Sequence, residues 1–149
     1  MFSQKANATE LIKTFLTFIK LTDLKNNIMK YFKLAFINWN KFKGRANRSE
    51  FWYFNLFNLI LSIILHYIDI SFLGYSTMDP TSIGISQSIF RLMVFIPSIS
   101  LTVRRLHDVN KSGWNMLWIL TLIGVFYVLH LNTVKGNKED NNYGPPSKI

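Results

Sequence analysis

Three long apolar runs constrain this chain more than any other feature, because each approaches the length that crosses a lipid bilayer. They cover residues 51–73, 83–103 and 114–131 and are 23, 21 and 18 residues long. A helix needs about 20 largely apolar residues, each adding ~1.5 Å, to cross the hydrocarbon core. We therefore expect an all-α integral membrane helical bundle with three transmembrane helices, the third being at the short end of that range.

The segment before these runs is basic, and it predicts one or two N-terminal amphipathic helices. Ten of the 17 Lys and Arg residues lie within residues 1–50, and lysines surround an apolar pattern of helical spacing. The side chains of that pattern are Leu24, Ile28, Tyr31, Phe32, Ala35 and Trp39. Such a helix suits either the headgroup layer of an anionic membrane or a packing surface on protein. We expect an interfacial segment, 1–43, followed by a membrane domain, 44–149.

The charges between the apolar runs predict the topology. The connection 74–82 has no Lys or Arg, whereas the connection 104–113 carries Arg104, Arg105 and Lys111. Because cytoplasmic loops carry an excess of Lys and Arg, we expect the N-terminus and 104–113 in the cytoplasm and 74–82 outside. If the third run crosses the membrane, the C-terminal tail also lies outside.

Two arginine-rich junctions lie on the cytoplasmic side of this topology. They read GRANRSEFW, starting at Gly44, and RRLHDVNKSGW, starting at Arg104. Asn47 and Glu50 have the spacing of a helix N-cap and its capping-box acid, and Glu50 can pair with Arg104 or Arg105. We expect a cluster that binds lipid headgroups or a membrane partner, made of Arg45, Arg48, Glu50, Arg104, Arg105, His107 and Asp108. The aromatic residues expected at the membrane interface are Trp39, Trp52 and Trp114.

Together with NNYGPP at Asn141–Pro146, these junctions resemble the small bacterial inner-membrane family catalogued as domain of unknown function 805. Members of that family have a GRxxRxEfW junction, a second span ending in RRLHD, an SGW-led third span and a tail with N-x-Y/F-G-P-x-P. The resemblance covers roughly residues 29–146, with KGNKED standing where the family often has G-T-x-G. It implies a compact multi-helix fold in the bacterial inner membrane and brings no substrate.

Asp69 and Arg91 are ionisable residues inside the first two runs. Asp69 lies four residues before the end of the first run, which places it ~6 Å deep, and Arg91 lies ~9 Å into the second. A charge at the middle of a bilayer costs roughly 2.5–3.5 kcal/mol. We therefore expect an ion pair between Asp69 and Arg91. The alternatives are separate snorkelling to the outer headgroups and an ion or proton path.

The sequence contains little that predicts catalysis. It has no cysteine, which excludes disulfides and thiolate chemistry. His107–Asp108 is the only pair of neighbouring His and acidic residues, and catalysis or metal binding would need further convergent partners. We expect no metal and no cofactor, and no nucleic-acid binding because no reader motif accompanies the basic residues.

These observations favour a multi-pass membrane protein that acts as a non-enzymatic scaffold or accessory subunit. Its expected partners are membrane lipids, anionic ones above all, and a membrane-protein partner or further copies of the chain. One alternative is an oligomeric transport component for a small solute or ion. The other is a membrane-associated enzyme that uses His107 and Asp108.

Overall fold

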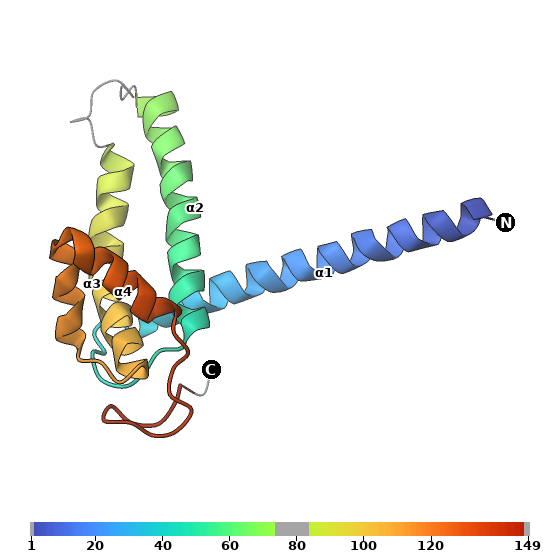
Figure 1. Ribbon diagram of the computed structural model, residues 1–149. Helices are drawn as coiled ribbons and strands as arrows, with labels where there is room; N and C mark the ends of the chain where they lie inside the picture. Colours follow the sequence, from blue (N-terminus) through green and yellow to red (C-terminus); the bar gives the residue numbers. More distant parts are fainter. Residues whose placement is uncertain (1, 74–83, 148–149) are drawn as a thin grey trace.

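The computed structural model describes residues 2–73 and 84–147. Its elements are α1 (Phe2–Ile37), α2 (Arg48–Leu73), α3 (Ile85–Asp108), the 3-10 helix η1 (Gly113–Leu120) and α4 (Leu122–Thr133), as Figure 1 shows. These described ranges contain no β-strand, only an isolated bridge between Asn141 and Gly144. The prediction of an all-α protein is confirmed.

Helices α2 and α3 lie side by side and run in opposite directions (Figure 1). Their 26 and 24 residues correspond to about 39 and 36 Å, which exceeds the ~30 Å hydrocarbon core. Both helices are long and apolar enough to cross a membrane, as predicted for residues 51–73 and 83–103. The predicted outer connection, 74–82, and the first residue of the second run lie outside the described residues.

The third apolar run does not form the single transmembrane helix that we expected over residues 114–131. It divides into η1 and α4, because Thr121 between them has an extended backbone. The Thr121 hydroxyl oxygen accepts a hydrogen bond from the Gly124 amide at 3.0 Å, so Thr121 is the N-cap of a new helix, α4. A β-carbon at Gly124 would lie 1.9 Å from the Trp118 carbonyl oxygen, so only glycine fits the turn. Hydropathy measures apolar content and does not register this turn.

The N-terminal segment is one continuous helix, α1, which projects away from the α2–α3 pair (Figure 1). Among the side chains of α1 that the structure describes, those of its C-terminal turns pack on the rest of the protein. The Tyr31 ring stacks on Tyr53 with centroids 5.4 Å apart, the Phe32 ring lies 3.9 Å from that of Phe57, and Ala35 is fully buried. The packing alternative therefore holds for the C-terminal turns of α1, and the division at residue 43 stays a prediction.

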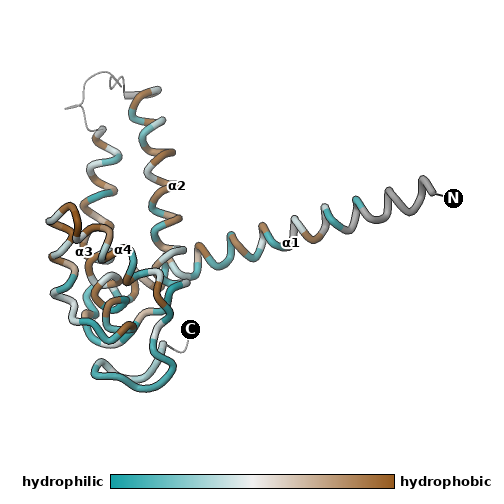
Figure 2. The backbone as a smooth tube through the Cα atoms, viewed as in Figure 1, coloured by the Kyte–Doolittle hydropathy of each residue, from teal (hydrophilic) through white to brown (hydrophobic). Residues whose placement is uncertain are grey.

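The C-terminal tail, residues 134–147, lies beside the two arginine-rich junctions. The Asn137 amide donates to the Asp108 carbonyl at 2.9 Å, and the Asn141 side chain donates to the His107 carbonyl at 2.9 Å. The tail therefore shares one end of the molecule with the junctions, and the single third helix on which a tail on the outer side depended divides at Thr121 instead. Figure 2 shows the hydrophilic tail and junctions gathered at one end of the molecule, with brown, hydrophobic stretches along α2, α3 and α4.

Candidate functional site

The structure brings together the seven residues Arg45, Arg48, Glu50, Arg104, Arg105, His107 and Asp108, hereafter the arginine cluster. They come from the loop before α2, the first turn of α2 and the last two turns of α3. All except Arg48 are buried. A buried charge is costly unless it is paired and hydrogen-bonded, so the partners of each charge decide what the cluster can do.

Asp108 lies between two arginines. Its Oδ1 atom lies 2.9 Å from Nη2 and 3.0 Å from Nε of Arg45, and its Oδ2 atom lies 2.5 Å from Nη1 of Arg105. The two guanidinium groups have no exposed side-chain surface. Charge-assisted hydrogen bonds of this kind are about twice as strong as neutral ones. Both carboxylate oxygens of Asp108 are thus occupied from within the protein.

The tail closes over Arg45. Its Nη1 atom donates to the carbonyl oxygens of Glu139 at 2.8 Å and Gly144 at 3.2 Å, and its Nη2 atom donates to the Asn137 carbonyl. The chain passes so near Asp108 that a β-carbon at Gly136 would lie 1.9 Å from Oδ2. The cluster predicted from the sequence did not include the tail. The NNYGPP motif, residues 141–146, was the only sequence feature that drew attention to this segment.

Arg105 holds the end of α4. Its Nη2 atom donates to the carbonyl oxygens of Val134 and, at 3.3 Å, of Asn132, to which Nε also donates at 3.4 Å. The exposed Arg48 adds a bond from Nη1 to the Thr133 carbonyl at 3.2 Å. The last carbonyls of a helix lack partners within the helix and carry partial negative charge. Two cations therefore fix the C-terminus of α4 at the junctions.

Glu50 pairs with Arg104, one of the two partners expected from the sequence. The Arg104 Nη1 to Glu50 Oε1 distance is 2.8 Å, and both side chains are buried. Asn47 accepts a hydrogen bond from the Glu50 amide at 2.8 Å, as its N-cap position predicts. The Ala46 amide donates to the Arg104 carbonyl at 3.0 Å, which joins the two junctions through the backbone.

His107 and Asp108 do not converge on one cavity. The His107 ring stacks on Tyr143 with centroids 3.8 Å apart and planes 4° apart, and its Nδ1 atom lies 3.2 Å from the Gly44 carbonyl oxygen. It lines a cavity with Phe42 and residues of η1, whereas Asp108 lines another with the tail. The enzyme alternative requires one cavity that holds both groups, so this geometry does not support it.

The predicted ion pair between Asp69 and Arg91 is not formed. Asp69 accepts hydrogen bonds from the backbone amides of Ser86 at 3.2 Å and Gln87 at 3.1 Å, while Arg91 is exposed. The first amides of a helix are free donors with partial positive charge, so the start of α3 satisfies the carboxylate. Matched depth in two helices was therefore the wrong criterion.

The three tryptophans expected at the membrane interface are exposed. They occur just after α1, at the beginning of the second turn of α2 and in the first turn of η1. Their exposed fractions are 48% for Trp39, 44% for Trp52 and 79% for Trp114. Their interfacial role stays a prediction.

The fold and the cluster define a helical membrane protein whose junctions and tail are tied together by arginines. The chain belongs to the family described as "Protein of unknown function (DUF805)", whose profile matches residues 39–145. It is 32% identical over 122 residues to "Inner membrane protein YhaH" of Escherichia coli K12, covering 81% of this chain and 98% of the relative. It is 32% identical over 125 residues to "Inner membrane protein YhaI" of the same strain, with the same coverage. No solved structure matches the chain.

Proposed function

We propose that the protein is a non-enzymatic scaffold or accessory subunit of the bacterial inner membrane that binds anionic lipid headgroups through α1. The observation that carries the proposal is the extent of α1 beyond the body of the protein. Phe2–Lys30 precedes the packed turns, which amounts to about 43 Å of helix. Every described side chain from Lys20 to Asn26 is exposed.

The charge of this arm favours an anionic surface. Exposed lysines occur at positions 20, 25, 30 and 33, against a single acid, Asp23, in the same stretch. Each Lys near an anionic membrane contributes about 1 kcal/mol, so the net attraction is about 3 kcal/mol. Positive-inside topology puts α1 on the cytoplasmic side, where anionic headgroups and apolar chains meet the exposed Leu21 and Leu24.

The arginine cluster has a different part in this proposal from the one its composition suggests. The guanidinium groups of Arg45 and Arg105 donate their hydrogen bonds to Asp108 and to backbone carbonyls. These two arginines therefore stabilise the fold of the protein rather than bind headgroups. Arg48 is the exposed member. It lines a shallow cavity with Trp52 and Thr133, a combination that suits a headgroup phosphate.

The test uses the absence of native cysteine. The Asn26→Cys variant of the full chain, labelled with an environment-sensitive dye, is reconstituted in phosphatidylcholine vesicles with or without phosphatidylglycerol. We expect a blue shift with phosphatidylglycerol that 0.5 M salt or Gln at the four exposed lysines removes. Asn142→Cys, exposed in the tail, is the matched control and should not respond. Equal spectra in both vesicles would refute lipid binding by α1.

A further inference from the structure

The apolar hairpin, residues 113–133, consists of η1, the turn at Thr121 and α4. Figure 1 shows η1 rising from the end of α3 and α4 returning toward the start of α2. The eight residues of η1 and the twelve of α4 correspond to about 16 Å and 18 Å. Neither limb crosses a hydrocarbon core of ~30 Å. Each limb matches about half of that thickness.

Both ends of the hairpin are held at the arginine cluster. Ser112 caps η1 directly after α3, and Arg48 and Arg105 bind the last carbonyls of α4. Figure 1 shows the turn between η1 and α4 at the opposite end of the hairpin from the junctions. The hairpin therefore enters and leaves on the side where the junctions lie.

The tip of the hairpin is built for an apolar environment. Leu120 and Ile123 are both 84% exposed, so their side chains need a partner outside the chain. Hydrocarbon also requires every backbone polar group to be satisfied. At the tip, the Thr121 amide donates to the Trp118 carbonyl at 3.0 Å, and the Gly124 amide donates to the Thr121 hydroxyl at 3.0 Å.

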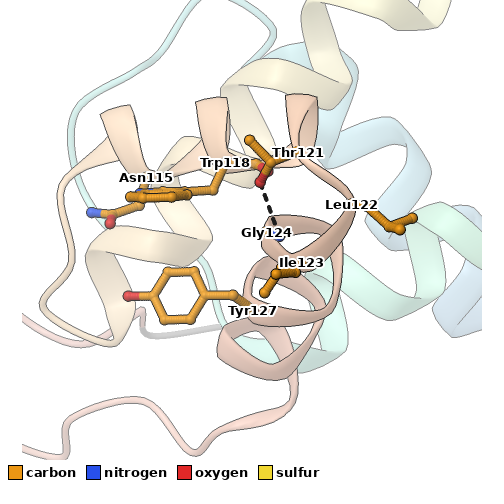
Figure 3. A pocket seen from close by; sticks show the side chains of 7 residues that line it. All are labelled: Asn115, Trp118, Thr121, Leu122, Ile123, Gly124 and Tyr127. Carbon is orange, nitrogen blue, oxygen red and sulfur yellow. Dashed lines mark hydrogen bonds between the residues drawn. The ribbon is translucent and has the colours of Figure 1, made fainter.

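A groove of about 780 Å³ opens between the two limbs. Figure 3 shows the rings of Trp118 and Tyr127 on opposite sides of it, with Asn115 at one end. The residues that line it carry no charge: Asn115, Trp118, Thr121, Leu122, Ile123, Gly124 and Tyr127. A groove that lies within one leaflet of the bilayer is surrounded by lipid acyl chains.

We propose that residues 113–133 form a re-entrant hairpin in the leaflet on the side of the arginine cluster, with phospholipid acyl chains filling the groove between Trp118 and Tyr127. The hairpin then covers the cytoplasmic half of α3, against which η1 packs. The proposal does not depend on lipid binding by α1. It places the two termini on the same side of the membrane.

Sidedness is tested with single cysteines at Ser112 and Lys135 in the full chain in sealed vesicles. A membrane-impermeant maleimide should label both positions from the same side, because the hairpin returns to it. Labelling from opposite sides would overturn the proposal and restore a third transmembrane helix. The comparison needs no knowledge of the absolute orientation, and both positions lie outside the two limbs.

Depth and the occupant of the groove are tested by fluorescence quenching. One variant keeps only Trp118 and its matched control keeps only Trp114, the other tryptophans being replaced by Phe. Lipids brominated in the middle of the acyl chain should quench Trp118 at least twice as strongly as Trp114, which lies at the start of η1 near the junctions. Equal quenching, or stronger quenching of Trp118 by a water-soluble quencher, would overturn the proposal.

Discussion

Replacing Arg105 removes the side chain that ties α3 to the end of α4. Its guanidinium binds Asp108 at 2.5 Å and the carbonyls that end α4, with no exposed side-chain surface. Breaking a buried ion pair by removing one partner costs about 3–5 kcal/mol, because the other charge stays buried. We therefore expect Arg105→Met to lower the free energy of unfolding by about 3–5 kcal/mol.

The assay is equilibrium unfolding of the full chain in mixed detergent micelles, followed by tryptophan fluorescence. Arg48→Met is the matched control, since Arg48 is exposed and makes one carbonyl bond at 3.2 Å. It should cost at most about 1 kcal/mol. A double-mutant cycle with Asp108→Asn isolates the ion pair, with an expected coupling of about 1–3 kcal/mol.

Two results would refute this reasoning. If Arg105→Met were as stable as the Arg48→Met control, the cluster would not hold α4. If the double-mutant cycle showed no coupling, the loss of unfolding free energy would come from the hydrogen bonds to carbonyls alone. The ion pair between Arg105 and Asp108 would then contribute nothing to stability.

Two further substitutions test other contacts by the same unfolding assay. Gly136→Ala should cost about 1–3 kcal/mol, because its β-carbon would meet Asp108 at 1.9 Å; a neutral result would mean that the tail is not packed there. Asp69→Ala should cost about 1 kcal/mol through the lost contacts at the start of α3. Combined with Arg91→Gln, its effect should add within about 0.5 kcal/mol, and clear non-additivity would restore the ion pair.

Length and charge predicted the parts of the fold that depend on one-dimensional quantities. Runs of 23 and 21 apolar residues became α2 and α3, because hydrocarbon thickness sets a minimum helix length. The spacing of Asn47 and Glu50 likewise predicted the start of α2. The side shared by the two junctions followed from the charge of the loops and the antiparallel order of α2 and α3.

The remaining features depend on backbone groups, which residue type does not reveal. The third apolar run divides where the Thr121 hydroxyl oxygen accepts a hydrogen bond from the Gly124 amide. A hydropathy average over many residues does not detect a single hydrogen bond of this kind. The Asp69 carboxylate accepts hydrogen bonds from two backbone amides at the start of α3 rather than pairing with Arg91. A prediction made from charged side chains alone leaves out these amide donors at helix ends. The arginines of the cluster bind the tail at four backbone carbonyls, those of Val134, Asn137, Glu139 and Gly144, and every residue type has such a carbonyl.

The contacts of Arg45 have a consequence for the order in which the protein matures. The carbonyls it binds belong to residues 92, 94 and 99 positions further along the chain. At a synthesis rate of about 5–20 residues per second, they leave the ribosome roughly 5–20 s after Arg45. During that interval both helical crossings can enter the bilayer, while the guanidinium stays hydrated at the surface. The contacts over Arg45 form only after Asn137, Glu139 and Gly144 have been made, so a segment synthesised well after the first junction completes it.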